Sequence, residues 1–382
     1  MGALRVERAS SGEWLTQQGR SAWQRFDVQL TFYALALAVI GLLMAYSNSS
    51  GPALTPGSTF TRGLMWMAVA IAVFSVASAV DTRWLRTFGW LIYAVNLTLL
   101  VLTLAIGSGV GGVSRWVSIL GLQFQFSEVA KILMIGVLAA FLAGRREKLG
   151  SLSTAVGAGL LIGPPFLLVL VQPDLGTSLV FAAILLGMLF MTGVRLRWLA
   201  LGAAMVVAAA PVIWSVLADY QRRRLLSFLD PTADPLGSGF QLIQSQIAVG
   251  SGGLLGTGLD SGGTGAAALL PVQTTDFAAA VLFQELGFVG GIIVFALFVA
   301  LIWRVLLAGW RSDDMFGVAF AAGVASLLLF QLIVNVGMII GIMPVTGIPL
   351  PFITHGGASL ISIALGLGIL QSINMRRERP DW

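Results

Sequence analysis

Ten apolar segments, each about as long as a membrane-spanning helix, dominate this sequence. A helix needs about 20 mostly apolar residues to cross the hydrocarbon core of a bilayer. The segments that meet this length are residues 28–47, 62–80, 87–106, 127–144, 152–171, 176–193, 198–217, 277–307, 317–340 and 355–374. The sequence therefore predicts an all-α, polytopic membrane protein with ten transmembrane helices and a large extracellular loop, 218–275, between spans seven and eight.

Composition supports this class and excludes several others. Hydrophobic residues make up 57% of the chain and charged residues 10%, whereas soluble domains have about 25% charged residues. The absence of cysteine rules out disulfides and thiolate metal sites, and a single histidine rules out multi-histidine metal sites. The net charge of +5 comes from basic residues scattered between the apolar segments, which predicts membrane topology and no nucleic-acid partner.

The distribution of lysine and arginine predicts the orientation. With a cytoplasmic N-terminus, 16 of these residues fall on the inside and five on the outside, so both termini are expected to be cytoplasmic. The five outside are Arg62, Arg115, Arg222, Arg223 and Arg224. We expect a cytoplasmic tail over 1–25, a single ten-helix membrane domain over 26–375 and a second tail over 376–382. The polar first 25 residues contain no apolar core, so no cleaved signal peptide is predicted.

One carboxylate, Asp276, stands where the large loop enters the eighth span. As a helix N-cap, it would accept the free amide protons of the next turn. As a functional group, low-dielectric surroundings would strengthen it as a base for proton abstraction. Position alone favours neither role.

Two groups of basic residues are predicted outside, where topology gives no reason for them. Arg222, Arg223 and Arg224 begin the large loop, and Arg115 precedes Trp116 in a glycine-flanked loop. The triple-arginine group would bind lipid headgroups or an anionic ligand, because guanidinium groups match phosphate geometry. The Arg115–Trp116 pair would anchor the chain at the membrane interface or hold a lipid-linked phosphate.

Four further ionisable residues lie in or beside the spans, where such groups are costly. Glu128 and Lys131 are three residues apart, so they share a helix face and form either a structural ion pair or part of a site. Asp174 follows proline in a tight hairpin, as a turn or cap residue or a functional group. Glu285 follows Asp276 by two and a half helical turns, which places the two carboxylates on different faces.

Polar and irregular segments mark the last two spans. Gln331 and Asn335 are one turn apart and are expected to hydrogen-bond across helices. Three prolines and several glycines break the helix over 341–357, which is tolerated where backbone is buried or lines a cavity. His355 in this segment is interpreted as a packing residue. Together these features predict a polar cavity that faces outward.

The large loop is expected to contain structure. Residues 240–249 are amphipathic and predict a short surface helix. Residues 251–265 are rich in glycine but follow no strand, so they are not a nucleotide-binding fingerprint. These glycines would let the backbone approach a ligand or another helix, or keep the loop mobile. The sequence shows no P-loop and no pore-like ring of polar residues, which argues against an ATP-driven pump or an open channel.

At several motifs the sequence resembles the SEDS family, the shape, elongation, division and sporulation proteins of bacteria, and within it the RodA branch. The motifs are SRWVSILGLQFQFSEVAK at 114–131, QPDLGTS at 172–178, YQRRRLLSFLDPTADPLGSGFQLIQSQIAVGSGGLLGTGL at 220–259, LLPVQTTDFAAAVLFQELGFVGG at 269–291 and NVGMIIGIMPVTGIPLPFITHGGASL at 335–360. The chain departs from the family pattern at Thr274, where histidine is usual, at Phe126, where proline is usual, and at His355 in the SYGG motif.

The resemblance implies an enzyme that polymerises lipid II, an undecaprenyl-pyrophosphate-linked disaccharide peptide, on the outer face of the bacterial cytoplasmic membrane. Asp276 would be the catalytic carboxylate that deprotonates the 4-hydroxyl of the acceptor. The substrate-binding residues would be Arg115, Trp116, Glu128, Lys131, Asp174, Arg222, Arg223 and Arg224. A class B penicillin-binding protein is the implied partner, and a divalent cation, Mg²⁺ or Mn²⁺, would bridge pyrophosphate and carboxylate, with no ligand set legible.

Two other functions compatible with the residues are kept as alternatives. A lipid II flippase would use the intramembrane groups Glu128, Lys131 and Asp174 for alternating access. A non-catalytic scaffold of the elongation or division machinery would not depend on Asp276.

Overall fold

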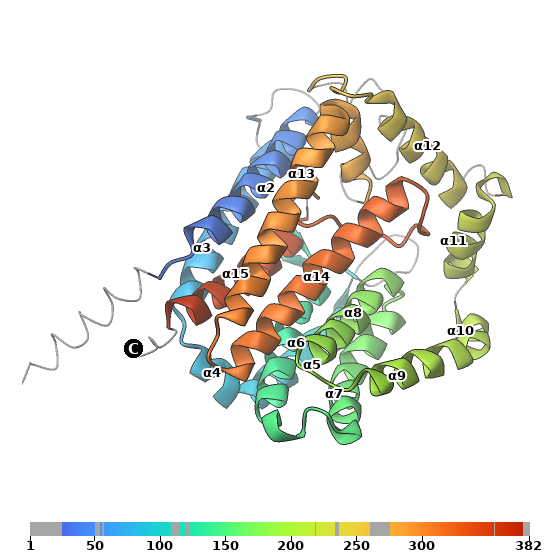
Figure 1. Ribbon diagram of the computed structural model, residues 1–382. Coiled ribbons are helices and arrows are strands. Elements are labelled where there is room, and N and C mark those ends of the chain that lie inside the picture. Colours follow the sequence, from blue (N-terminus) through green and yellow to red (C-terminus); the bar gives the residue numbers. More distant parts are fainter. Residues whose placement is uncertain are drawn as a thin grey trace, which may run out of the picture.

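The computed structural model describes residues 25–49, 54–55, 57–107, 115–119, 122–217, 219–233, 237–259, 276–354 and 356–376. This part of the chain is almost entirely helical (Figure 1). The helices are α2 (Val28–Ser47), α3 (Thr59–Ala79), α4 (Thr82–Thr87), α5 (Gly89–Ile106), α6 (Phe126–Ala143), α7 (Leu152–Val171), α8 (Leu175–Met191), α9 (Leu196–Ala208), α10 (Ala210–Val216), α11 (Asp219–Leu229), α12 (Ser238–Ser251), α13 (Ala278–Trp310), α14 (Met315–Ile339) and α15 (Gly357–Met375). Strands β1 (Val117–Ile119) and β2 (Leu122–Phe124) form a short antiparallel hairpin.

The predicted spans are confirmed as helices in the described residues. Eight helices are long and apolar enough to cross a membrane, and α8 and α9 are shorter apolar helices at the sixth and seventh predicted spans. The seventh span is not continuous, because it divides between α9 and α10 at Ala209. Pro211 follows directly and has no amide hydrogen to donate to the preceding turn, which explains the break.

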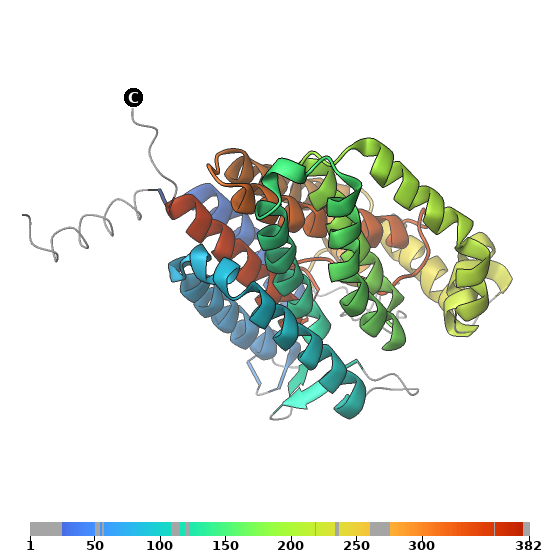
Figure 2. The ribbon, with the colours of Figure 1, turned by 90° about the horizontal axis from the view of Figure 1, so that it is seen from below.

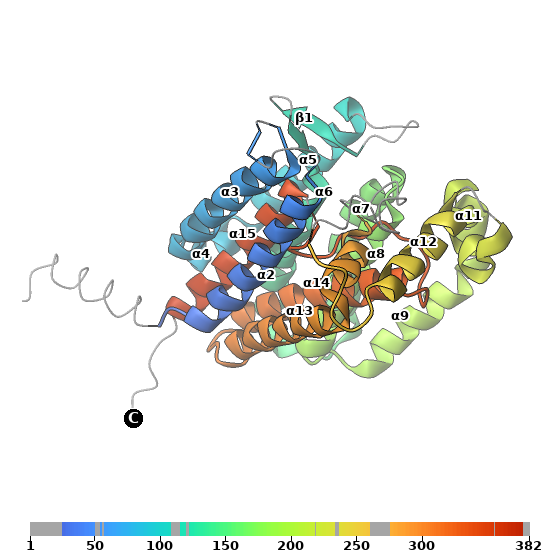
Figure 3. The ribbon, with the colours of Figure 1, turned by 90° about the horizontal axis from the view of Figure 1, so that it is seen from above.

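Three helices form the buried centre of the bundle. The apolar windows of α6, α14 and α15 are 67%, 72% and 78% buried, whereas those of α3 and α5 are 11% and 17% buried. Alanine and glycine recur in the first half of α14, and such small residues let neighbouring helices approach closely. The views from below and above show the other helices arranged around this centre (Figures 2 and 3). Their exposed apolar side chains are those expected of surfaces that face lipid.

Contacts between helix ends define one end of the bundle. At this end, which we call the basic end, Arg304 pairs with Asp27 at 2.6 Å and Arg86 pairs with Asp314. Arg376 at the end of α15 donates to the carbonyl of Ser78 at the same end. These arginines are among the residues predicted inside, so the predicted grouping of basic residues is consistent with the packing.

The eighth span is interrupted, which the sequence analysis did not predict. Gly287 has φ 67° and ψ −169°, so α13 is two helices joined at a kink. The residues after α12 pack into this kink: the amide of Thr257 donates to the carbonyl of Gln284 at 2.9 Å, and the amide of Gly258 to that of Glu285 at 3.1 Å. The glycines in this part of 251–265 thus allow close approach to another helix, as one interpretation of that stretch predicted.

The large loop contains helices α11 and α12, which lie with α10 on the side of the bundle away from α2 and α3 (Figure 1). Helix α12 confirms the amphipathic helix predicted over 240–249. The segment from Gly341 to Gly356 contains no regular helix in its described residues, and Val345, Ile348, Leu350 and Phe352 in it are buried. The break predicted over 341–357 is therefore confirmed as irregular backbone enclosed by protein. His355, Thr274 and Thr275 lie outside the described residues.

Candidate active site

Asp276 precedes the first turn of α13 and is half-buried. The N-cap residue of α13 is Phe277, which makes no side-chain cap hydrogen bond, so Asp276 lies one residue before the N-cap position. Asp276 is fixed through its backbone, because the side-chain amide of Asn335 on α14 donates to its carbonyl oxygen at 3.1 Å. The same amide donates to the carbonyl of Ile348 at 2.7 Å. Asn335 thus ties Asp276 to the irregular segment.

The Asp276 carboxylate and a guanidinium border the same residue of that segment. A Cβ atom added to Gly347 would lie 3.3 Å from Oδ2 of Asp276 and 3.5 Å from Nη1 of Arg224. Gly347 has φ +74°, a conformation that L side chains rarely adopt. Its lack of a side chain therefore leaves room for a carboxylate and a guanidinium from two distant parts of the sequence to approach each other.

The three arginines of α11 have different surroundings, because consecutive helical residues point about 100° apart. Arg222 donates to the carbonyls of Trp214 at 3.0 Å and Ser215 at 2.7 Å, which satisfies carbonyls at the end of α10. Arg223 is exposed, and Arg224 is half-buried beside Asp276. The structure thus brings Arg224 of this group to the carboxylate.

Arg115 and Trp116 also diverge. Arg115 donates from Nε to the carbonyl of Gln172 at 3.1 Å and lines a small cleft together with Gln221 and Arg224. Trp116 lines a different and larger cavity, described below. Arg115 and Arg224 therefore place two positive charges on one cleft, next to the segment that carries Gly347.

Glu128 and Lys131 form the ion pair that their spacing predicted. Lys131 Nζ lies 2.7 Å from Glu128 Oε1, and the side chains are 1% and 4% exposed. Glu128 Oε2 has no hydrogen-bond partner within the described residues. Both residues face the packed centre of the bundle, so the pair itself neutralises most of its charge there.

Asp174 caps α8, as one of its two interpretations predicted. Its Oδ1 accepts the amide of Thr177 at 3.1 Å, and its Oδ2 accepts the Thr177 hydroxyl at 2.9 Å. Gln125 also donates to Oδ2 at 3.0 Å, which connects the hairpin to the start of α6. Glu285 accepts from Ser47 on α2 and does not pair with Asp276, in line with the prediction of separate faces.

The described residues do not assemble a metal site of their own. No group of three or more histidine, aspartate or glutamate side chains close enough to hold an ion occurs among them. Among the described residues, the charged side chain beside Asp276 is Arg224, which is itself a cation. A divalent cation needs several oxygen ligands. These residues do not fit a resident divalent cation.

Sequence reasoning missed three contributors to this end of the bundle. Asn335 was expected to form an interhelical hydrogen bond, but its partner, the backbone of Asp276, was not foreseen. Gln125 and the break at Gly287 gave no separate signal. The proline usual in the family at the position of Phe126 would be the first residue of α6, where proline is favoured, so its replacement leaves the helix start unchanged.

Comparison with known proteins places this arrangement in a family. The FtsW/RodA/SpoVE family model, described as cell cycle protein, matches residues 28–379. The peptidoglycan glycosyltransferase MrdB of Escherichia coli K12 is 38% identical over 364 residues, which cover 94% of this chain and 96% of that protein. The stage V sporulation protein E of Bacillus subtilis is 35% identical, covering 91% and 96%.

Solved structures agree with these relatives. A chain from a peptidoglycan synthase complex that coordinates polymerisation and crosslinking matches with a TM-score of 0.77 and 31% identity, covering 91% of this chain and 97% of that chain. The rod shape determining protein RodA of Thermus thermophilus matches with a TM-score of 0.67 and 26% identity, covering 93% and 98%. Sequence and fold therefore agree that this chain belongs to the FtsW/RodA/SpoVE family, the SEDS proteins.

Proposed function

We propose that this protein polymerises lipid II into glycan strands during cell elongation, with Asp276 as the general base. The chain is a multi-pass membrane protein and a RodA-like peptidoglycan glycosyltransferase. The observation that supports the role of Asp276 is its carboxylate beside the Arg224 guanidinium at Gly347, held there through Asn335.

In the proposed reaction, Asp276 removes the proton from the 4-hydroxyl of the acceptor sugar. The hydroxyl oxygen attacks the anomeric carbon of the donor, and the bond from that carbon to the diphosphate oxygen breaks. The new glycosidic bond joins the two saccharides, and undecaprenyl pyrophosphate leaves with the bonding electron pair. Arg224 and Arg115 stabilise the negative charge that develops on the departing diphosphate.

The remaining residues of the predicted site act through these groups. The Glu128–Lys131 pair and Asp174 fix the starts of α6 and α8. The carbonyl of Gln172, just before α8, accepts from Arg115, which lines the cleft. Arg222 orders the junction of α10 with α11, and Arg223 contacts lipid headgroups. No step above depends on a divalent cation, because the described residues do not supply the several oxygen ligands that such an ion would need.

The setting of the reaction follows from the same proposal. Asp276 lies at the end of the bundle opposite the basic end, because α14 runs from Asp314 at the basic end to Asn335 beside Asp276. With the basic end in the cytoplasm, both termini are cytoplasmic and the reaction occurs on the outer face of the cytoplasmic membrane. A class B penicillin-binding protein would crosslink the strands as they form, and the relative from a synthase complex supports such a partner.

The experiment is lipid II polymerisation by the purified protein with its partner. We expect Asp276→Asn, which keeps shape but cannot accept a proton, to lower strand formation by about 10²-fold or more. Asp313→Asn, at an exposed aspartate near the basic end, is the matched control and retains full activity. Equal strand formation by the Asp276 variant and the unmutated protein would refute the proposal.

The two alternatives give different results in the same system. A flippase moves labelled lipid II across sealed vesicles without making polymer. A scaffold supports growth of a deletion strain equally well with Asp276→Asn. Either result would replace the polymerase proposal.

A further inference from the structure

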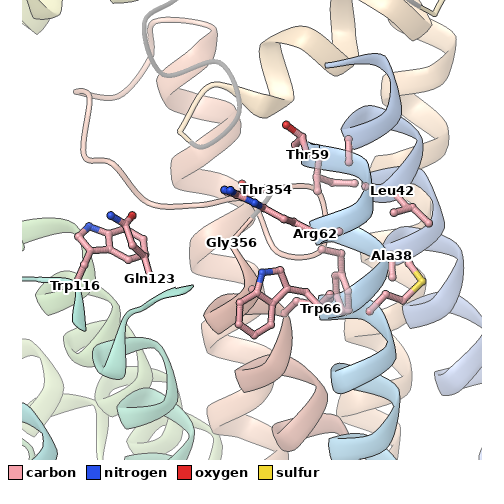
Figure 4. A pocket seen from close by; sticks show the side chains of 17 residues that line it. Ala38, Leu42, Thr59, Arg62, Trp66, Trp116, Gln123, Thr354 and Gly356 are labelled. Carbon is pink, nitrogen blue, oxygen red and sulfur yellow. The ribbon is translucent and has the colours of Figure 1, made fainter. Parts of the chain in front are cut away.

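A second, larger cavity lies away from Asp276. Its volume is about 540 Å³, within the range of small-molecule sites. It lies between α2, α3, the β1–β2 hairpin and the start of α15. Figure 4 shows Trp116 and Gln123 on one side of the cavity and Arg62 and Trp66, which belong to α3, on the other.

Arg62 gives this cavity its charge. Among the described residues that line it, Arg62 is the cation and none is acidic. Within the described chain the Arg62 guanidinium makes no ion pair or hydrogen bond. Arg62 is also one of the five basic residues predicted on the outside, against the topology rule. An unpaired guanidinium in a cavity that lacks carboxylates is a site for an anion, and its fork matches phosphate oxygens.

The rest of the lining fits a sugar next to that anion. The indole rings of Trp66 and Trp116 offer flat apolar surfaces from opposite sides. Gln123, Thr59 and Thr354 add an amide and two hydroxyl groups, which suit sugar hydroxyls. Small-molecule sites are usually lined by apolar side chains together with a small number of polar groups, as this cavity is.

The cavity and Asp276 share one structural segment. Gly347 borders the Asp276 carboxylate, and Phe352, Ile353 and Thr354 line the cavity. Gly347 and Phe352 are five residues apart, so their Cα atoms are separated by at most about 19 Å at 3.8 Å per residue. The segment is held at the cavity by α2, where Gly41 leaves no room for a side chain against the carbonyl of Phe352. The two sites are therefore connected by one short segment of the chain.

The chemistry of the proposed reaction assigns different partners to these sites. In the donor, the diphosphate is bonded to the reacting anomeric carbon, so it must lie beside Asp276, where Arg224 and Arg115 are. In the acceptor, the reacting 4-hydroxyl and the diphosphate are at opposite ends of the disaccharide. The acceptor therefore needs a second cationic site, separate from Asp276 by about the length of its two sugar rings.

We propose that the cavity at Arg62 binds the diphosphate-linked end of the acceptor lipid, an inference that rests on the proposed function. Arg62 pairs with the diphosphate, and Trp66 and Trp116 pack against the sugar attached to it. The acceptor then extends along the segment 347–354 and presents its 4-hydroxyl to Asp276.

Two lipid II analogues separate the sites experimentally. An analogue with a methylated 4-hydroxyl acts only as donor, and one whose anomeric oxygen is replaced by a methylene group cannot lose its diphosphate and acts only as acceptor. Together they form one lipid-linked tetrasaccharide. Its rate of formation is measured while the concentration of each analogue is varied in turn. For Arg62→Gln, we expect the KM of the acceptor analogue to rise about tenfold or more. The KM of the donor analogue and kcat should change less than about twofold.

Controls keep this result specific. Arg62→Lys retains the charge and should recover most of the acceptor affinity, and Arg83→Gln, at an exposed arginine of α4, should change neither KM. Trp116→Leu tests the opposite wall and should also raise the acceptor KM alone. Thermal unfolding of each purified variant reports its folding, and the Trp116 variant decides the outcome if Arg62→Gln does not fold.

Several outcomes would overturn the inference. An unchanged acceptor KM in Arg62→Gln, or equal rises in both KM values, would do so. Phosphatidylglycerol nanodiscs test a different ligand. If Arg62→Gln loses the thermal stabilisation that these nanodiscs give the unmutated protein, while its acceptor KM is unchanged, Arg62 binds ordinary lipid headgroups. These results are distinct from failure of the proposed function, in which the unmutated protein itself makes no tetrasaccharide.

Discussion

The side-chain amide of Asn335 donates both of its hydrogens to backbone carbonyls, one of Asp276 at 3.1 Å and one of Ile348 at 2.7 Å. These carbonyls belong to two separate segments, the entry to α13 and the irregular chain before α15. A single buried amide on α14 thus sets the position of the proposed base relative to Gly347 and Arg224. The position of Asp276 therefore depends on a tertiary contact, and the N-cap position of its own helix belongs to Phe277.

Replacing Asn335 by alanine should lower kcat more than it changes KM. The carbonyls of the half-buried Asp276 and the buried Ile348 would lose their donor, at a cost of about 1–3 kcal/mol in stability. A displacement of the base by about 1 Å can lower the rate about 10²-fold. Tetrasaccharide formation at saturating substrate measures kcat, and thermal unfolding measures stability. Loss of stability with unchanged kcat in the folded fraction would show that Asn335 only supports the fold.

Gln331 provides the matched control one helical turn earlier. It is equally buried, at 1% exposure, and its amide nitrogen and oxygen have no hydrogen-bond partner among the described residues. Gln331→Met removes this unsatisfied group at similar volume, so stability should stay the same or rise. Activity should be unchanged. A loss comparable to that of Asn335→Ala would mean that any polar change in α14 disturbs the site.

The features that the sequence predicted are those set by local physics. A helix in lipid must form all its backbone hydrogen bonds internally and must present an apolar surface. The spans can therefore be predicted from long apolar segments. The Glu128–Lys131 pair follows from a three-residue spacing on one helix, and the Asp174 cap from proline and a following helix start. Each of these can be read within a few residues of sequence.

The features that it did not predict depend on distant segments. The kink at Gly287 lies in a segment that was predicted as one continuous span. The carbonyls of Gln284 and Glu285 before it accept from amides 27 residues earlier, at Thr257 and Gly258. Arg115 and Trp116 are adjacent in sequence but line different cavities, which no spacing rule reveals. The start of α13 was also read one residue too early, because the N-cap position belongs to Phe277 and not to Asp276.

Adding a methyl group at Gly347 should reduce activity beyond its effect on stability. The new Cβ would lie 3.3 Å from the Asp276 carboxylate, which must therefore shift slightly, and 3.5 Å from Arg224, which is an ordinary contact. Gly193→Ala is the control, since Gly193 also has positive φ, +86°, but has nothing within 4 Å of the added atom. Both variants carry the backbone strain, about 1 kcal/mol or more. Only Gly347→Ala should lower kcat, and equal kcat for the two variants would exclude a role for Gly347 in the site.

The Glu128–Lys131 pair should show strong coupling between its members. Lys131→Met leaves a buried carboxylate without its cation and should cost about 3–5 kcal/mol. The double variant Glu128→Gln with Lys131→Met removes both charges and should recover much of that loss. Thermal unfolding of the single and double variants gives the coupling. If the double variant is stable but inactive, the pair contacts substrate; if it is stable and active, the pair serves the fold alone.

The close packing of the large loop against the kink in α13 gives a final prediction. A Cβ on Gly256 would lie 2.0 Å from the carbonyl oxygen of Glu285, whereas one on Gly253 would meet nothing within 4 Å. Both glycines have positive φ, +85° and +54°, so both alanine variants carry backbone strain. The difference between them isolates the clash, and Gly256→Ala should be less stable by about 1–3 kcal/mol. Thermal unfolding measures the difference, and limited proteolysis should show earlier cleavage in the loop of Gly256→Ala because it can no longer cover the kink. Equal stability of the two variants would mean that the loop does not hold the kink, and that the break at Gly287 is maintained by α13 itself.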